Sequence, residues 1–138
     1  MNILFFLTPK SELAYLYPDY SVKKTLDIME QYRHAVIPLI EHDGKYCGII
    51  TEGDLLYNLK NEFHFNLANA DNIPISSLDT RRTYEPVSIS ATVEEVFKKS
   101  MVQKFVHVVD DDGIFIGIVK RRDIIHYFYD KYIHEQVN

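Results

Sequence analysis

Short apolar runs separated by polar turns appear in the same order twice along the chain. The run Tyr46–Thr51 follows an Asp-Gly turn and precedes Asp54, and the run Ile114–Val119 follows another Asp-Gly turn and precedes Asp123. The two copies are offset by 69 positions, the difference between 123 and 54. That period is too long for a solenoid repeat, and two copies are too few to stack into one. We therefore expect one pseudo-symmetric domain built from two similar halves.

The first half shows the periodicity of a helix followed by a hairpin and a second helix. Ser21 is a residue type that caps helices, and Leu26, Ile28 and Met29 give the segment after it apolar positions. An Asp-Gly pair between two apolar runs predicts a tight hairpin turn. The expected elements are a short strand at Ala14–Tyr17, a helix from Val22 to about Tyr32, strands at Val36–Ile40 and Tyr46–Thr51, and a helix from about Glu52 to Asn61.

The second half repeats this order. Thr92 and Glu95 form the pattern of a capping box, which places a helix start at Val93. The other expected elements are a strand at Val87–Ile89, strands at Val106–Val109 and Ile114–Val119 around the turn Asp110–Gly113, and a helix from Arg121 to about Ile133. Each half thus has the order β-α-β-β-α, roughly, and the sequence predicts an α+β (α/β) fold.

Composition narrows the class of protein. With 138 residues, 46% of them apolar, the chain can form the core of a single domain. Its net charge of -5 argues against nucleic-acid binding, whereas a phosphorylated small molecule needs only a few local cations. The apolar segment Ile3–Leu7 is too short to span a membrane, so we expect a cytoplasmic protein with no membrane partner. The single cysteine, Cys47, is predicted to be a small core residue.

The repeated pattern resembles the tandem CBS-domain pair, the family named after cystathionine beta-synthase. Its most specific element is a glycine, two apolar residues, Thr or Ser, two variable residues and Asp, which is met by the string from Gly48 to Asp54. The preceding strand Ile37–Ile40, the Asp43-Gly44 turn and the second copy strengthen the match. The resemblance divides the chain into a first motif at 1–61, a linker at 62–72 and a second motif at 73–138.

The resemblance implies a regulatory module that binds an adenosine-containing ligand such as AMP, ADP, ATP, S-adenosylmethionine or cyclic di-AMP. The residue chemistry fits this expectation. A junction between a strand and a helix presents free N–H groups and the positive end of the helix dipole, which favour phosphate. The Thr51 hydroxyl can add a hydrogen bond there, and Asp54 can accept from two ribose hydroxyls.

In this family each binding cleft is shared by the two motifs. The first expected cleft combines Thr51 and Asp54 with residues of the second half and of the segment before it, namely Thr80, Arg81, Arg82, Phe105 and Val106. The second combines Asp123, Lys120 and Lys104 with residues of the first motif, namely Thr8, Pro9, Lys10, Ala35 and Val36.

The second copy departs from the family pattern at two positions. Lys120 stands where the family has Thr or Ser, and it either binds phosphate as a point charge or fills the cleft with its stem. Lys104 and Lys10 are further candidate phosphate contacts. His107 replaces the usual proline of the central strand.

Simpler interpretations of these residues stay open. Thr51 can be an N-terminal helix cap and Asp54 a partner for the helix dipole, without any ligand. The six histidines have no spacing typical of metal ligands, and no recognisable nucleophile motif is present, so we expect no enzyme, no catalytic or metal-binding residues and no required cofactor. The sequence therefore predicts a nucleotide sensor, expected from the family to form a homodimer and to act on a separate, unknown regulated protein. The alternative is a ligand-free interaction scaffold.

Overall fold

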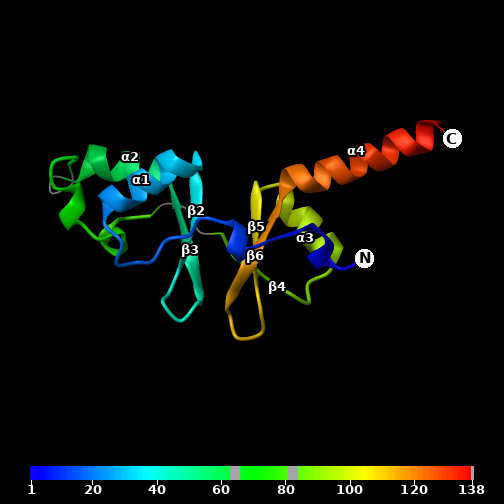
Figure 1. Cartoon of the computed structure of the whole chain (residues 1–138), viewed down its shortest axis with the longest axis horizontal. Coiled ribbons are helices and arrows are strands. Elements are labelled where there is room, and N and C mark those ends of the chain that lie inside the picture. Colours follow the sequence, from blue (N-terminus) through cyan, green and yellow to red (C-terminus); the bar gives the residue numbers. More distant parts are fainter. Residues whose placement is uncertain (63–65, 81–83, 138) are drawn as a thin grey trace. The chain divides into compact units, whose positions relative to one another are not determined.

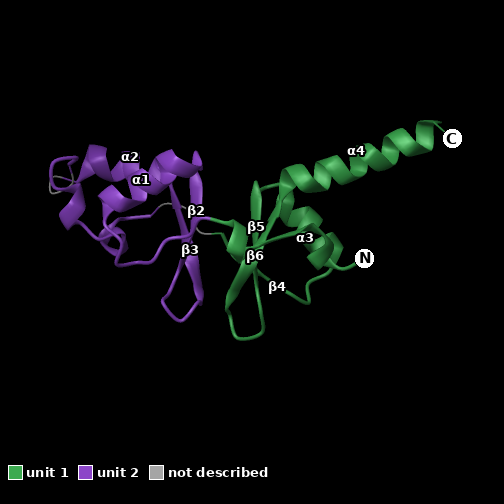
Figure 2. Cartoon of the chain, in the orientation of Figure 1, with its two compact units in different colours: residues 1–13, 84–138 green, residues 14–83 purple. Residues whose placement is uncertain are grey.

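The structure is a computed structural model that describes residues 1–62, 66–80 and 84–137 (Figure 1). The chain forms two compact units. Unit 2 is the continuous segment 14–83, and unit 1 combines residues 1–13 with residues 84–138 (Figure 2). The N-terminal segment therefore packs with the second half of the chain.

Unit 2 contains two helices and a two-stranded antiparallel hairpin. Its elements are α1 (Val22–Tyr32), β2 (Val36–Ile40), β3 (Tyr46–Thr51) and α2 (Glu52–Asn61), followed by 3-10 helices at Ala70–Asn72 and Ile75–Ser77. The helix α1 begins where the Ser21 hydroxyl accepts a hydrogen bond from the Lys24 N–H (3.0 Å), and it ends at Arg33, whose φ of 54° is left-handed. The core of this unit lies between the helices, the hairpin and the 3-10 segments, and includes Leu16, Ile37, Ile50 and Ile75.

Unit 1 contains a four-stranded sheet in which the strands lie in the order β1 (Leu7–Pro9), β6 (Phe115–Lys120), β5 (Phe105–Val109) and β4 (Val87–Ser88). The strand β5 pairs antiparallel with β6, β4 lies parallel to β5, and β1 lies antiparallel to β6. The elements are a 3-10 helix at Ile3–Phe6, β1 (Leu7–Pro9), a 3-10 helix at Lys10–Glu12, β4 (Val87–Ser88), α3 (Val93–Ser100), β5 (Phe105–Val109), β6 (Phe115–Lys120) and α4 (Arg121–Val137).

The contact between β1 and β6 holds the N-terminal segment in unit 1. Pro9 lies opposite Gly117, and Thr8 lies opposite Ile118. A Cβ at Gly117 would overlap the Thr8 carbonyl oxygen, and the φ of Gly117 is 157°. Glycine is needed at this position because it lets two backbones approach closely.

A similar exchange occurs in unit 2. The segment after the linker packs on α1, since the Val22 N–H donates to the Ile73 carbonyl (2.8 Å) and the Ile75 N–H donates to the Tyr20 carbonyl (2.9 Å). The two compact units therefore do not coincide with the two halves of the sequence repeat. The division of the repeat into two motifs by a linker at residues 62–72 stays a prediction.

The α+β fold and most of the expected elements are confirmed, and the differences are local. The strand expected at Ala14–Tyr17 is a single-residue bridge, in which Leu16 exchanges two backbone hydrogen bonds of 2.9 Å with β2. The last helix continues past Ile133 to Val137. Cys47 is exposed, so the prediction of a core cysteine was wrong: it lies at the register shift of the hairpin, near the turn, whereas Ile49 and Ile50 further along β3 are buried.

His107 is buried in the middle of β5. The strand is regular at this position, and His107 lies opposite Ile118 in the ladder with β6. Its side chain is 1% exposed and lies near Tyr84 and Phe115, with each pair of ring centroids 6.0 Å apart. Burial lowers the pKa of His107 to about 4, because the imidazolium form is poorly solvated there.

The burial of His107 predicts a loss of stability in mild acid. The unfolded chain takes up a proton at this residue near its ordinary pKa of about 6.5, whereas the folded chain takes it up only near 4, so the free energy of unfolding falls as the pH drops between these values. The full effect is about 3 kcal/mol. Urea unfolding of wild type and His107→Gln at pH 7, 6 and 5 measures it. The variant should lose less stability over this range, with His126→Gln, at an exposed position, as control. Equal pH slopes for His107→Gln and wild type would contradict the assignment.

Candidate functional site

The junction between β3 and α2 in unit 2 is a complete capping box. The Thr51 hydroxyl accepts from the Asp54 N–H (3.0 Å), and Asp54 Oδ2 accepts from the Thr51 N–H (2.9 Å). Asp54 is 1% exposed. The interpretation of Thr51 as a helix cap is thus confirmed. The cap does not exclude a ligand, because the Asp54 carboxylate offers about four acceptor sites on its two oxygens.

Asn58 joins this junction to the segment that contains Thr80. The Asn58 side-chain nitrogen donates to the carbonyls of Asp54 (2.7 Å) and Asp79 (2.8 Å), and its oxygen accepts from the Asp79 N–H (3.1 Å). Asn58 is 2% exposed, so these bonds are shielded from water. They hold Asp79 against α2, and the exposed Thr80 is the next residue along the chain. The predicted contacts Arg81 and Arg82 lie outside the described residues.

Sequence reasoning missed Asn58. A signal was present, since asparagine is a poor residue for a helix interior and Asn58 follows Asp54 by one helical turn. An asparagine at such a position often bonds to the backbone of another segment.

The corresponding junction in unit 1 faces a cavity. Residues from the N-terminal 3-10 helix, from β1 and from α4 line an open hollow of about 340 Å³, which we call the cavity; they are Phe5, Phe6, Leu7, Thr8, Asp123, His126, Tyr127 and Asp130. Thr8 and Asp123, which were both predicted for the second cleft, therefore line the same cavity, and both are half-buried. A hydroxyl and two carboxylates around apolar walls can accept hydrogen bonds from sugar hydroxyls.

Tyr127 in unit 1 occupies the position that Asn58 has in unit 2, four residues after the aspartate in each helix. Its ring lies edge-on to Phe5 (centroids 5.7 Å apart) and to Phe6 (5.4 Å). Aromatic packing therefore attaches the N-terminal segment to α4, whereas hydrogen bonds attach Asp79 to α2 in unit 2.

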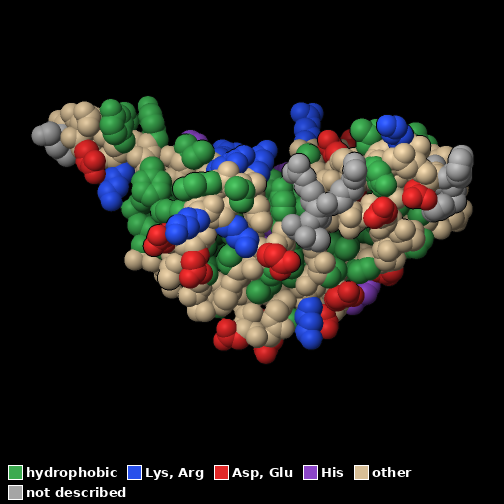
Figure 3. Space-filling model, turned by 180° about the vertical axis from the view of Figure 1, so that it is seen from behind, with side chains coloured by type: hydrophobic (Ala, Val, Ile, Leu, Met, Phe, Trp, Pro, Cys, Tyr) green, Lys and Arg blue, Asp and Glu red, His purple; other side chains and the backbone are tan. Residues whose placement is uncertain are grey.

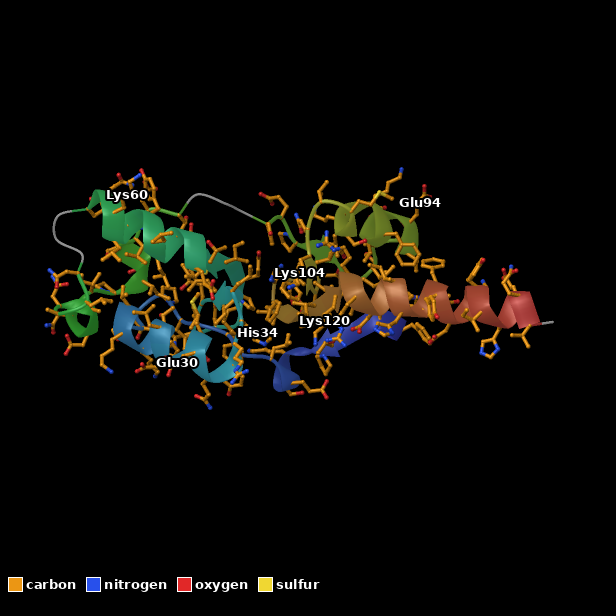
Figure 4. All side chains as sticks on the ribbon, turned by 90° about the horizontal axis from the view of Figure 1, so that it is seen from above. Glu30, His34, Lys60, Glu94, Lys104 and Lys120 are labelled. Atoms are coloured by element: carbon orange, nitrogen blue, oxygen red, sulfur yellow. The ribbon has the colours of Figure 1, made fainter. Side chains whose placement is uncertain are left out.

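Two lysines predicted for the second cleft, Lys104 and Lys120, lie at the ends of the hairpin strands β5 and β6 (Figure 4). Lys104 immediately precedes β5, and Phe105 lies opposite Lys120 in the ladder, so the two lysines are close together. Lys104 is exposed and its Nζ lies 5.5 Å from the centre of the Phe105 ring, whereas Lys120 is half-buried at the start of α4. Lys10 follows β1 directly. These cations are absent from the lining of the described cavity, so the positive charge of the site is separated from its carboxylates.

Arg121 has a structural role. Its backbone N–H donates to the Lys104 carbonyl (3.0 Å), and its guanidinium reaches the Ser100 carbonyl at the end of α3 (3.5 Å). These bonds fix the first turn of α4 against the segment that precedes β5, and so fix the relative positions of Lys104 and Lys120.

Within each unit, the hairpin places residues that were predicted for one cleft beside residues that were predicted for the other. In unit 2, Ala35 and Val36 adjoin Thr51, because the Glu52 N–H donates to the Ala35 carbonyl (2.9 Å) and Val36 lies opposite Thr51 in the hairpin. In unit 1, Phe105 and Val106 adjoin Lys120 and Val119 in the same way. Each predicted cleft as a whole combines residues of both units, and this combination stays a prediction.

The described residues offer neither a metal site nor a membrane-spanning helix. No group of three or more His, Cys, Asp or Glu side chains there is arranged to hold a metal ion. Within the same part of the chain, no helix has both the length and the apolar character that crossing a bilayer requires.

Known protein structures with this arrangement include nucleotide complexes. The chain is similar to CbpB in complex with c-di-AMP, with 19% identity, a TM-score of 0.87 and coverage of 99% of this chain and 89% of the other. It is also similar to CBSX2 in complex with AMP, with 22% identity, a TM-score of 0.76 and coverage of 95% and 98%. At these identities the likeness shows the fold.

Sequence comparison gives the same family. The chain is 30% identical over 111 residues to an inosine-5'-monophosphate dehydrogenase of Aquifex aeolicus (strain VF5), a match that covers 78% of this chain and 21% of that enzyme. It is 26% identical to an uncharacterized protein of Rickettsia prowazekii (strain Madrid E), over 83% of this chain and 34% of that protein. The chain thus spans between a fifth and about a third of these relatives. The family model of the CBS domain matches residues 7–61 and 75–130. The chain belongs to the CBS domain family, and it carries the domain twice.

Proposed function

We propose that this protein is a non-catalytic sensor that binds an adenosine-containing nucleotide at its strand-to-helix junctions and regulates a separate protein. The observation that carries the proposal is the cavity in unit 1, where Thr8 and Asp123 meet although 115 positions separate them along the chain (123 minus 8). The complexes of CbpB with c-di-AMP and of CBSX2 with AMP support the class of ligand.

The cavity suits the nucleoside part of such a ligand. Its volume of about 340 Å³ falls in the lower range of small-molecule sites, which is about 300 to 1,000 Å³. Asp123 is half-buried there, so its carboxylate can accept hydrogen bonds from a ribose while remaining partly shielded from water. The equivalent Asp54 is 1% exposed and already occupied by its cap, so we infer that the unit 1 junction is the stronger site.

The lysines supply the anion-binding part of the site. Lys120 lies at the positive end of the α4 dipole, where a phosphate is favoured, and Lys104 is its neighbour across the hairpin. The proposal assigns Lys120 to phosphate rather than to filling the cleft. A monophosphate or a cyclic dinucleotide then binds more tightly than adenosine.

Regulation requires that the ligand favour one arrangement of the protein over another. The segment that carries Thr8 runs directly into unit 2, because the chain passes between the units at residues 13 and 14. A ligand that binds Thr8 and Asp123 therefore stabilises β1 on β6, next to one of the two places where the chain passes from one unit to the other.

A scaffold without a ligand is the second candidate function. It is favoured by the exposed aromatic residues of α4, which include Tyr129 (60% exposed) and Tyr132 (57%). These side chains offer a surface for another protein whether or not a nucleotide binds.

The nucleotide proposal predicts a selective thermal shift. AMP, ADP, ATP, S-adenosylmethionine and cyclic di-AMP are compared by thermal unfolding, with GMP and cyclic di-GMP as controls. A ligand at 100 times its dissociation constant stabilises the folded state by about 2.7 kcal/mol, which is a shift of several degrees. Asp123→Asn should weaken binding by about 1 to 3 kcal/mol, because it removes a charge-assisted bond while keeping the side-chain shape.

The matched control is Asp111→Asn, which removes the same charge from an exposed turn. A shift lost in Asp54→Asn but kept in Asp123→Asn would move the site to unit 2. No shift with any of the adenine compounds would contradict the sensor and leave the scaffold.

The assignment of Lys120 predicts a change in the preference for charged ligands. Lys120→Thr should weaken binding of AMP by about 1 kcal/mol or more while leaving adenosine binding within a few tenths, because it removes a point charge near the phosphate. Calorimetric titrations with both ligands measure the difference. Tighter binding of both by the variant would instead show that the lysine stem obstructs the site.

A further inference from the structure

The cavity in unit 1 continues along α4 beyond Asp123. Asp123, His126, Tyr127 and Asp130 line it, and their spacing of three or four positions places them on one face of the helix. From Asp123 to Asp130 is seven positions (130 minus 123), which is about 10 Å along the helix axis. The cavity therefore extends well beyond the reach of a ribose bound at Asp123.

The groups assigned in the proposed function indicate which part of the ligand enters this extension. Lys120, assigned to phosphate, immediately precedes α4, and Asp123, assigned to the ribose, lies in the first turn of α4. The ribose of a nucleotide joins the phosphate to the base, so we expect the base on the side of Asp123 that lies away from Lys120. That direction leads along the cavity to Tyr127 and Asp130.

Aromatic rings form the walls of this extension. The Phe5 ring lines the cavity, is 67% exposed, and lies edge-on to the Tyr127 ring (centroids 5.7 Å apart). A base stacked on Phe5 would cover an apolar ring that the chain leaves in water. Bases of every kind stack on aromatic side chains, so stacking contributes affinity but little selectivity.

The outer face of α4 lies away from the cavity. It carries Ile125, Tyr129 and Tyr132, each more than half exposed, and apolar side chains gather along α4 at the upper left of Figure 3. All three of these described residues lie outside the lining of the cavity. A base bound in the cavity therefore leaves the outer face uncovered.

We propose that Asp130 selects the base by accepting a hydrogen bond from the 6-amino group of adenine. The inference rests on the proposed function and deepens it by naming a residue that reads the base. A carboxylate accepts hydrogen bonds and donates none, so it attracts an amino group and repels a carbonyl oxygen at the same place. Adenine has an amino group at position 6, whereas guanine has an oxygen there.

The side chains beside Asp130 fit the same edge of adenine. Asp130 is exposed, so its oxygens are open to a ligand that enters the cavity. His126 lies one helical turn before it on the same face, is also exposed, and can donate a hydrogen bond to the adjoining ring nitrogen of adenine. An acceptor next to a donor matches the amino group and ring nitrogen that adenine presents side by side.

Calorimetric titration of the full chain tests this selection with three nucleotides. They are AMP, IMP, which has an oxygen at position 6, and purine riboside 5'-monophosphate, which has a hydrogen there. We expect the wild type to bind AMP at least about tenfold more tightly than either analogue, because each analogue lacks the amino group. The ratio between ligands is the readout, since a general change in charge or folding alters the affinity for all three alike.

Two substitutions at Asp130 give different ratios. Asp130→Asn should reduce the preference for AMP over IMP to within about threefold, because an amide can donate to the oxygen of IMP as well as accept from the amino group of AMP. Asp130→Ala should bind AMP and purine riboside 5'-monophosphate equally. The control Glu135→Gln removes one charge from an exposed position of α4 outside the cavity lining, and it should keep the preference of the wild type.

A substitution at Phe5 separates stacking from selection. Phe5→Leu should weaken the binding of all three nucleotides by about tenfold and leave their ratios unchanged. Circular dichroism confirms that each variant is folded. A preference for AMP that survives both Asp130 substitutions would overturn the role of Asp130 while the sensor stands, and so would tighter binding of GMP than of AMP through Asp130. No binding of AMP by the wild type would contradict this inference and the proposed function together.

Discussion

Close contact between the backbones of β1 and β6 determines how unit 1 is assembled. Gly117 has no side chain, and this allows the Thr8 carbonyl to lie against β6. The resulting ladder brings Thr8 to the helix that carries Asp123, and the aromatic contacts of Tyr127 with Phe5 and Phe6 hold the segment from its other end. The cavity exists because a segment from the start of the chain completes a unit built from its end. A side chain at Gly117 would separate β1 from β6 and open the cavity.

The two junctions carry the same motif but use it differently. In unit 2 the Thr51 and Asp54 side chains cap α2 reciprocally, and Asn58 fixes the neighbouring segment through three hydrogen bonds. In unit 1, Lys120 cannot accept a hydrogen bond and so cannot replace the threonine cap, but it adds a charge at the positive end of a helix dipole. An anion bound at the start of α4 compensates both for the missing threonine cap and for the added positive charge. The departure from the family pattern thus favours a ligand in unit 1 and an internally satisfied junction in unit 2.

Local chemistry made most elements predictable from the sequence. The bounds of α1, β2, β3 and α2 follow from a serine cap, a threonine cap, an Asp-Gly turn and the apolar periodicity between them.

The roles of Asn58 and Tyr127 were not predicted, because they depend on contacts with segments more than 20 positions away. The exchange of residues 1–13 into unit 1 is non-local in the same sense. The exposure of Cys47 was missed because an apolar run does not show where along a strand burial begins, nor where the hairpin register shifts. Among the predicted site residues, Thr8 and Asp123 meet in one cavity, whereas the pairing of residues from different units stays a prediction.

The central claim is that a nucleotide binds where β6 meets α4, against the segment exchanged from the N-terminus. An amide-resolved NMR titration of the full chain with AMP, and then with cyclic di-AMP, tests it most directly. The account predicts saturable shifts of the backbone amides of Lys120 to Asp123 and of Thr8, larger than those at the junction of Thr51 and Asp54. Shifts confined to the outer face of α4, or no shift at millimolar ligand, would contradict it.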